Sequence, residues 1–299
     1  MIRGFFRYLR RLYAYQKARF PVFLLLISLV PAIVSSNAVI TGNFDWVTTM
    51  LAALASIAYL FHIRVIDERR DADHDRLHHP DRPIQSGAIT HDELCIADVL
   101  VSALFIGIAF FSSPYAFLLA LLAMAYTYFA GQEFFLGEKI RKHFFFYNAI
   151  NLAQMVLLQL FIYALFDGTP TLTPIIIVHF LFTATGTIAI EFMRKLKAPE
   201  NEGTGMDTYT WHLGFERAVG VFIAIIVLSF GFSTLLVGMA RIPFAICVVA
   251  GLIALLSVLY FLKTKKKHGE TFLQLAFLLN YSACNIAIAI PIFLNYASA

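Results

Sequence analysis

The chain has 299 residues, of which 60% are hydrophobic, 15% aromatic and only 14% charged, with a mean hydropathy of +0.74 and a net charge of +4. Soluble globular domains are about 25% charged, so the composition excludes an ordinary soluble enzyme and indicates an all-α integral membrane protein. The three cysteines lie in apolar runs without the spacing of a metal site, and they indicate small core residues in a reduced setting.

Residues 1–19 form a basic segment, MIRGFFRYLRRLYAYQKAR, without a signal-peptide cleavage pattern. Its arginines alternate with Phe, Leu and Tyr, as in a helix that lies on an anionic membrane surface. A plain basic anchor is the alternative. The segment is predicted to stand apart from a single transmembrane domain over residues 20–299.

Nine apolar runs follow, each long enough or nearly long enough to cross a bilayer, which takes about 20 residues. The predicted spans are 20–40, 46–66, 93–112, 114–130, 145–166, 174–193, 216–238, 242–262 and 272–296. The fourth is the shortest. A tight turn at Ser112, Ser113 and Pro114 separates it from the third.

The placement of charge predicts the topology, because Lys and Arg concentrate in cytoplasmic segments. With a cytoplasmic N-terminus and nine spans, 22 of the 23 Lys and Arg fall in inner segments, and Arg241 alone does not. Among the acids, only Asp45 and Asp167 fall in outer loops. The C-terminus is therefore predicted outside, and the chemistry on the cytoplasmic side of what we expect to be a bacterial inner membrane.

The segment after the second span, RVIDERRDADHDRLHHPDRPIQSG from residue 64, gathers acids and arginines. If the helix continues past Ile66, then Asp67, Asp71 and Asp75 lie at i, i+4 and i+8 on one face, with Glu68 beside them. Like charges at this spacing destabilise a helix by roughly 0.2–0.5 kcal/mol per pair. The ladder therefore needs a counter-charge.

Three interpretations of this ladder compete. It could be a solvated helix end in which Arg64, Arg69 and Arg70 pair with the acids. It could bind Mg²⁺, which takes carboxylate oxygens and leaves positions for phosphate, while nearby Arg and Lys hold the remaining phosphate oxygens. A transporter pathway would place acids deep inside the spans, but here they lie at the ends.

The residues that follow the ladder favour the second interpretation. Pro80-Asp81-Arg82-Pro83-Ile84-Gln85-Ser86-Gly87 resembles the P-x-R-P-I-x-S-G segment of the UbiA superfamily of intramembrane prenyltransferases, which follows N-D-x-x-D-x-x-x-D. In that alignment the last two aspartates of the family are Asp71 and Asp75, whereas its N-D pair is Asp67-Glu68 and its common Lys before the Pro is His79. Glu68 is the main departure from the family pattern, because its side chain is one carbon longer than that of the aspartate in the family's N-D pair. Asp73 and Asp81 fall off the ladder and are expected to be solvated or paired with arginine.

A second acidic segment follows the sixth span. Glu191 lies at the inner end of that span, with Arg194 at i+3 and Lys195 at i+4, so it is either a simple helix ion pair or a metal ligand beside two phosphate clamps. The run from Gly205 to Gly214 resembles the family's G-I-x-T-x-x-x-x-L-G, although the upstream acids do not align cleanly. Two more acids, Glu200 and Glu202, are candidate ligands, and Asp207 is either a ligand or the cap of a helix that begins at Thr208.

The resemblance covers most of the chain and implies nine helices around a central cavity, with the two acidic clusters facing each other. It implies an enzyme that transfers an isoprenoid from a prenyl diphosphate to an acceptor with Mg²⁺ as cofactor. For catalysis it implies Asp71 and Asp75. As metal ligands it implies Asp67, Glu68, Asp71, Asp75, Glu191, Glu200 and Glu202. For diphosphate it implies Arg82, Lys139, Arg194 and Lys195.

Polar residues inside the spans are expected mostly to join neighbouring helices. Asn148, Asn151 and Gln154 lie about one turn apart on the fifth span, and with Tyr126 on the fourth they could line an acceptor pocket.

The alternative function is a non-catalytic or transport protein that binds a lipid phosphate or a cation. A CDP-alcohol transferase is excluded, because D-G-x-x-A-R followed by G-x-x-x-D-x-x-x-D is absent. No nucleic-acid partner is expected, and neither the acceptor nor the prenyl chain length follows from the residues.

Overall fold

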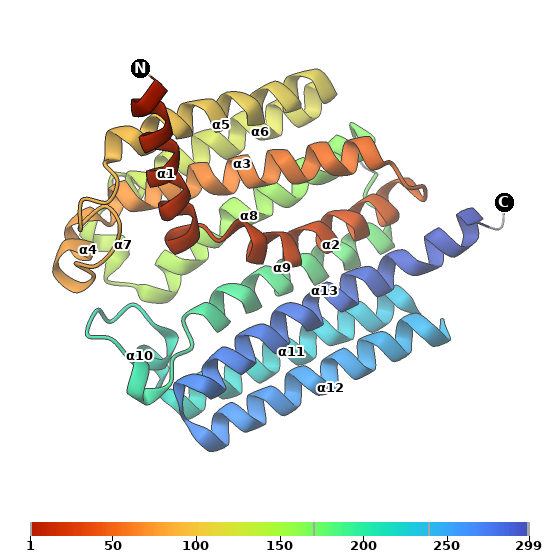
Figure 1. Cartoon of the computed structure of the whole chain (residues 1–299). Helices are drawn as coiled ribbons and strands as arrows, with labels where there is room; N and C mark the ends of the chain where they lie inside the picture. Colours follow the sequence, from red (N-terminus) through yellow and green to blue (C-terminus); the bar gives the residue numbers. More distant parts are fainter. Residues whose placement is uncertain (1, 170, 239, 298–299) are drawn as a thin grey trace. The chain divides into compact units, whose positions relative to one another are not determined.

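The structure is a computed structural model that describes residues 2–169, 171–238 and 240–297. These residues fold almost entirely into helices, with no strand among them (Figure 1). In chain order the elements are α1 (Ile2–Arg19), α2 (Val22–Thr41), α3 (Trp46–Arg70), α4 (Ala72–His78), α5 (His91–Ser112), α6 (Pro114–Gly131), η1 (Glu133–Phe135), α7 (Glu138–Arg141), α8 (Phe144–Asp167), α9 (Pro174–Arg194), η2 (Pro199–Asn201), α10 (Tyr209–Leu213), α11 (Phe215–Val237), α12 (Arg241–Thr264) and α13 (Lys267–Ala297).

Within these described ranges, nine helices are long and apolar enough to cross a membrane, and each matches one of the predicted spans. They are α2, α3, α5, α6, α8, α9, α11, α12 and α13. The main difference is at the first acidic segment, where α3 extends to Arg70 instead of ending near residue 66. The orientation of the termini stays a prediction.

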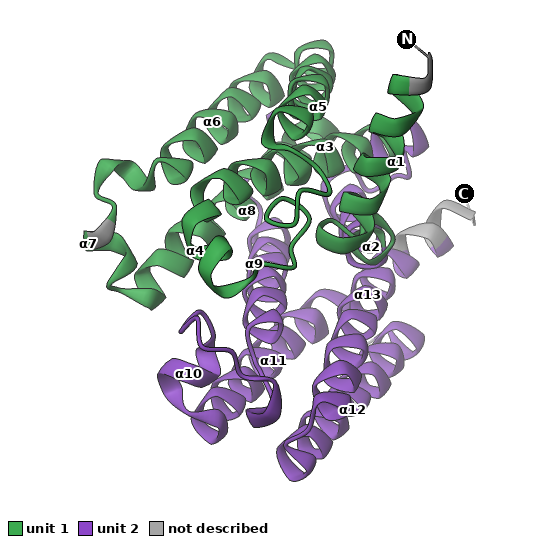
Figure 2. Ribbon diagram, turned by 60° about the vertical axis from the view of Figure 1, so that its left-hand side comes forward, with its two compact units in different colours: residues 1–26, 50–168 green, residues 27–49, 169–299 purple. Residues whose placement is uncertain are grey.

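The chain divides into two compact units, residues 1–26 with 50–168 (unit 1) and residues 27–49 with 169–299 (unit 2), coloured green and purple in Figure 2. The predicted single domain over residues 20–299 stays a prediction.

Unit 1 contains α1 and the helices on either side of the first acidic segment. Thr90 and Glu93 form a capping box that begins α5, in which the Thr90 hydroxyl accepts from the Glu93 N–H at 3.2 Å. Ser113 ends α5 and caps α6, whose first residue is Pro114. The tight turn predicted there is confirmed, and it allows α5 and α6 to pack side by side.

Unit 2 is held together by aromatic packing between its helices. Phe192 of α9 stacks on Tyr209 of α10 with ring centroids 4.0 Å apart, and its ring lies 6.1 Å from that of Phe222 in α11. Gly186 of α9 lies under the Tyr281 ring of α13, and a Cβ at Gly186 would come within 2.1 Å of that ring. A glycine is needed there for the close approach of the two helices.

Candidate functional site

The first acidic segment lies where α3 gives way to α4. Asp71 separates the two helices, with φ −93° and ψ 7°, yet the helical hydrogen bonds continue across it. The Asp71 N–H donates to the Asp67 carbonyl at 2.9 Å, and the Asp75 N–H donates to the Asp71 carbonyl at 2.8 Å. The backbone therefore keeps the predicted one-turn spacing, but the side chains have different partners.

Glu68 and Asp75 are the buried members of the ladder, with side chains 0% and 2% exposed. Glu68 Oε1 accepts from Arg19 of α1 and from Arg64 of α3, each at 2.8 Å. Asp75 forms an ion pair with Arg82, and Arg19 lies 3.9 Å from its second oxygen. Arginines from three parts of unit 1 thus offset the charge of these two acids.

Asp67 and Asp71 are the more accessible members, with side chains 27% and 37% exposed, and both lie beside Arg70. The Arg70 guanidinium is 2.8 Å from Asp67 and 3.0 Å from Asp71, and it donates to the Asn151 side-chain oxygen of α8 at 3.2 Å. It also lies over the Tyr147 ring, 5.3 Å from the centroid. A single arginine therefore serves both accessible carboxylates.

The environment keeps Asp71 ionised. Burial by itself raises the pKa of this carboxyl group, but the hydrogen bonds and charge of Arg70 outweigh burial, and the net pKa lies below the usual value. Arg141 and Arg64 add to the lowering. A carboxylate that is charged at neutral pH is the form that a cation requires.

The donor set fits a divalent cation that prefers oxygen. Glu68 Oε2 and Asp75 Oδ2 are buried and accept no hydrogen bond from the described residues, although buried acceptors are nearly always satisfied. With the exposed oxygens of Asp67 and Asp71, the segment offers carboxylate oxygens of the kind that Mg²⁺ takes in proteins.

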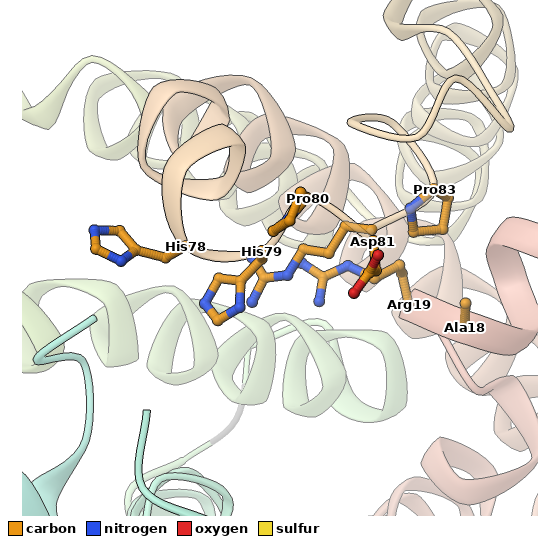
Figure 3. Close-up of a pocket in the computed structure, with 8 residues that line it drawn as sticks. Ala18, Arg19, His78, His79, Pro80, Asp81 and Pro83 are labelled. Atoms are coloured by element: carbon orange, nitrogen blue, oxygen red, sulfur yellow. The ribbon is translucent and has the colours of Figure 1, made fainter. Parts of the chain in front are cut away.

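A cavity of about 340 Å³ lies beside this segment in unit 1 (Figure 3). It is lined by Ala18, Arg19, His78, His79, Pro80, Asp81, Arg82 and Pro83. Two arginines and one aspartate face it, so its charge suits an anion better than a cation.

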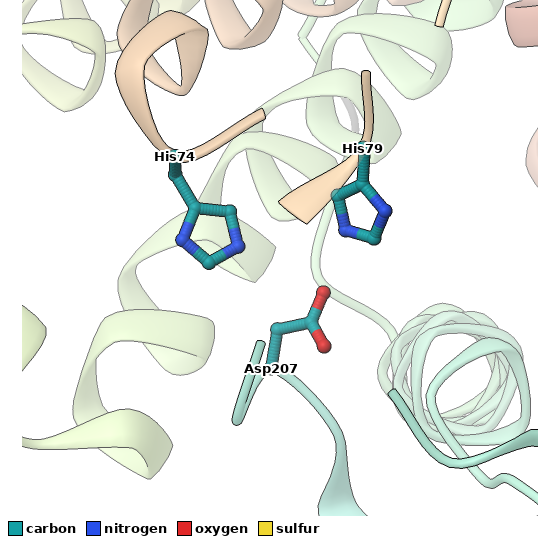
Figure 4. Close-up of side chains that lie close together, drawn as sticks. All are labelled: His74, His79 and Asp207. Atoms are coloured by element: carbon teal, nitrogen blue, oxygen red, sulfur yellow. The ribbon is translucent and has the colours of Figure 1, made fainter. Parts of the chain in front are cut away.

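The remaining polar residues of the segment lie off the ladder. Asp73 pairs with Arg76 at 3.1 Å while 90% exposed, which confirms the expectation that it is solvated or paired. His74, in α4, has its ring 4.6 Å from that of His78 and 6.0 Å from that of His79. Figure 4 draws His74 and His79, together with Asp207 from the loop that precedes α10 in unit 2.

The second acidic segment, in unit 2, combines local partners at Glu191 and Glu202 with a distant partner at Glu200. Glu191 pairs with Arg194 at 2.7 Å and with Lys195 at 3.0 Å, so the predicted helix ion pair is present. Glu200 accepts from the Lys267 N–H at 2.7 Å, and Glu202 accepts from the Thr208 hydroxyl at 2.5 Å.

The helix cap considered for Asp207 is wrong, because Thr208 is the residue that caps α10. Its side chain accepts from the Trp211 N–H at 3.1 Å. Thr208 has the β-region backbone and short hydroxyl side chain that a cap requires, and Asp207 lies one position too early.

Comparison with known families decides the identity of the chain. The model of the UbiA prenyltransferase family matches residues 28–281, which is most of the sequence. The chain belongs to the UbiA prenyltransferase family. This confirms the resemblance drawn from the ladder and the segment after it, and a family of membrane enzymes agrees with the nine candidate spans. No match was found among the sequences of curated proteins.

Solved UbiA structures share the fold at low sequence identity. A UbiA homologue from Aeropyrum pernix K1 superposes with a TM-score of 0.61 at 17% identity, over 90% of this chain and 97% of the other. A structure described for digeranylgeranylglyceryl phosphate synthase gives 0.59 at 16% identity, over 94% and 99%. A UbiA homologue from Archaeoglobus fulgidus, bound to DMAPP and Mg²⁺, gives 0.54 at 19% identity, over 92% and 99%.

Two of the residues proposed for an acceptor pocket, Tyr126 and Asn151, join helices of this UbiA chain. The Tyr126 hydroxyl of α6 donates to the Ile150 carbonyl of α8 at 2.9 Å, whereas buried Asn148 donates within α8, to the Phe144 carbonyl at 2.8 Å. Asn151 accepts from Arg70. Lys139, proposed for diphosphate, is exposed on α7.

Two contributors to these segments were missed from the sequence. Arg19, at the end of α1, binds Glu68 across 49 residues of chain. Glu270, in the first turn of α13, is buried and accepts from Lys197 at 2.8 Å, from the Ala198 N–H at 3.0 Å and from Asn201 at 3.1 Å. The signal for Glu270 was weak, because a lone acid after a basic turn is common at a helix start.

Proposed function

We propose that this protein is a Mg²⁺-dependent intramembrane prenyltransferase that transfers an isoprenoid chain from a prenyl diphosphate to an acceptor. Membership of the UbiA prenyltransferase family supports the reaction class. The observation that carries the proposal is the carboxylate ladder at the end of α3, with two accessible acids around Arg70 and two buried carboxylate oxygens that accept no hydrogen bond from the part of the chain that the structure describes. Relatives described as bound to DMAPP and Mg²⁺, or to GPP and Mg²⁺, support the donor and the cation.

In this proposal, Asp67 and Asp71 would hold the cation through their accessible oxygens, and Glu68 and Asp75 would contribute the two buried oxygens that accept no hydrogen bond from the described residues. Bound Mg²⁺ would neutralise the diphosphate and make it a better leaving group.

Arg70 orients Asp67 and Asp71, because its guanidinium contacts both carboxylates and is itself fixed by Asn151. The three arginines around Glu68 and Asp75 hold those acids in place, and they keep the segment attractive to a diphosphate despite its acids.

Phosphate contacts are proposed for Arg82, Lys139, Arg194 and Lys195. Arg82 lines the cavity beside the ladder, which supports its assignment most directly. In the second acidic segment, Glu191, Glu200 and Glu202 are proposed as metal ligands, and each would exchange a present partner for a cation.

The decisive test is turnover of DMAPP or GPP by the purified protein with Mg²⁺, followed as release of inorganic diphosphate. Asp71→Asn and Asp75→Asn are expected to lower the rate by more than the roughly 10–100-fold that loss of an outer-shell partner costs. Asp73→Asn is the matched control, because Asp73 is exposed, pairs only locally and lies between the two targets. If both ladder variants keep the wild-type rate, the assignment is wrong.

A binding or transport protein without transfer chemistry is the second candidate, and one contact favours it. Glu68, where the family has Asp, has one oxygen held by two arginines. This candidate predicts Mg²⁺-dependent binding of a prenyl diphosphate without diphosphate release, so the same assay with added isothermal titration separates the two.

The site is proposed to face the cytoplasm, in a bacterial inner membrane. Two cysteine variants test this orientation, Asp73→Cys in α4 and Asp167→Cys at the C-terminal end of α8. An impermeant maleimide applied from outside is expected to label Asp167→Cys and not Asp73→Cys. The reverse pattern would overturn the predicted topology.

A further inference from the structure

The first helix carries no acidic residue from Ile2 to Arg19. Figure 1 shows α1 running across α3 and α5 of unit 1, instead of along them. The chain then passes through Phe20 and Pro21 into α2, a candidate span. The C-terminal end of α1 is therefore fixed at a membrane boundary.

One side of α1 docks on unit 1 through Arg11, Tyr15 and Arg19, which lie at i, i+4 and i+8. Arg11 donates to the Ala88 carbonyl at 2.6 Å and to the Gly87 carbonyl at 3.2 Å, and it pairs with Glu93 at 2.8 Å. Tyr15 is fully buried in an apolar cluster that also contains residues of α3 and α5. This side therefore holds the segment after the ladder.

A second side of α1 is apolar and uncovered by the described residues. Phe5, Leu9 and Tyr13, again at i, i+4 and i+8, are 59%, 40% and 68% exposed, and Phe6 beside them is 65% exposed. Four large side chains in one stripe are more than the isolated exposed apolar residues of an ordinary protein surface.

The third side of α1 is basic. Arg7, Arg10 and Lys17 are exposed and lie between the apolar side and the docked side by the 100° rotation per residue of an α-helix. A helix with an apolar stripe, a flanking row of cations and no acids has the composition of helices that lie in a membrane interface.

We propose that the apolar and basic sides of α1 dock on the anionic lipid surface of the membrane that the chain spans. Phe5, Phe6, Leu9 and Tyr13 would enter the boundary between headgroups and acyl chains, and the three cations would lie over lipid phosphates. Charge complementarity selects this occupant, because each Lys or Arg near an anionic leaflet is worth about 1 kcal/mol, or roughly fivefold in binding. The proposal does not depend on the transferase reaction.

The test uses the full chain in nanodiscs that hold one copy each. A Trp46→Phe, Trp211→Phe background removes both native tryptophans, which are exposed, and Phe6→Trp then places a reporter on the apolar side. In discs rich in phosphatidylglycerol, the emission is expected to be blue-shifted, quenched by brominated lipid and shielded from iodide. In purely phosphatidylcholine discs, the lipid quenching is expected to be several-fold weaker.

The matched variant adds Arg7→Gln, Arg10→Gln and Lys17→Gln, all at exposed positions away from the docked side. It is expected to lose most of the dependence on anionic lipid. The proposal is overturned if the reporter stays open to iodide in both lipids, or if the neutralised variant keeps the same lipid dependence. Discs prepared with two copies serve as a further comparison. Shielding from iodide that occurs only in those discs, without lipid quenching, would assign the face to a second copy and would also overturn the proposal.

Discussion

The segments after α3 and α9 look alike in sequence, since each places acids and bases at the inner end of a span, but the structure holds them differently. Glu68 is bound by Arg19, 49 positions away, as well as by Arg64 one turn earlier, and Asp75 is bound by Arg82. Glu191 is bound by Arg194 and Lys195, both within one turn at the end of α9. The first segment is thus a tertiary structure that depends on α1. Around Glu191 the second is a local helix end, whereas Glu200 further along accepts from the Lys267 N–H.

The largest expected contrast between the segments is in stability. Glu68→Ala would leave Arg19 and Arg64 without their shared carboxylate, and removal of one partner of a buried pair costs about 3–5 kcal/mol. Glu191→Ala removes pairs with Arg194 and Lys195, whose side chains are 60% and 22% exposed, so its cost is expected to be smaller, about 1 kcal/mol.

Thermal unfolding of the detergent-solubilised variants, followed by circular dichroism, measures this contrast. Glu68→Gln is the control, because it keeps the size of the side chain and isolates the charge. Equal losses in Glu68→Ala and Glu191→Ala would contradict the distinction between a tertiary and a local segment.

Within unit 2, Glu270 and not a motif acid organises the loop after α9. Glu270→Gln is expected to cost about 1.5–3 kcal/mol, the range for hydrogen bonds to a charged group, because it weakens bonds to Lys197 and Ala198. Hydrogen exchange of the amides in residues 197–201 is expected to accelerate.

Glu202→Gln is the matched variant in the same loop, since it alters the hydrogen bond that the Glu202 side chain accepts from Thr208. We expect it to leave exchange at 197–201 near the wild-type rate. A larger effect for Glu202→Gln than for Glu270→Gln would show that the motif acid, and not Glu270, holds the loop.

These contacts also show what could be foreseen from the sequence. Span number and bounds followed from runs of apolar residues and from Lys and Arg placement, and local pairs such as Glu191 with Arg194 followed from helical spacing. The separation of the ladder into two buried and two accessible acids could not be predicted from the sequence. It depends on Arg19, Arg82 and Asn151, which reach the ladder through tertiary packing that has no fixed sequence spacing. The cap considered at Asp207, one of two alternatives for that residue, lies at Thr208 instead, since Asp and Thr are both good caps.

The smallest predicted effect concerns pH and compares Asp71 with its exposed neighbour Asp73. The folded-state pKa of Asp71 is lowered, because Arg70 outweighs burial, so its ionised form stabilises the fold above the unfolded pKa near 4. That contribution is lost as the pH falls from about 5 through the folded pKa. Because the side chain is 37% exposed, solvent screening limits it to about 1 kcal/mol.

Asp71→Asn should therefore lose less melting temperature than the wild type as the pH falls from about 5 to about 3, the range around the ordinary pKa of Asp. Asp73→Asn should leave the fall unchanged, because its partner Arg76 is 74% exposed and water screens the pair. If the two variants have the same pH profile, then Arg70 does not distinguish the ladder acid from its solvated neighbour, and the orienting role proposed for Arg70 fails with it.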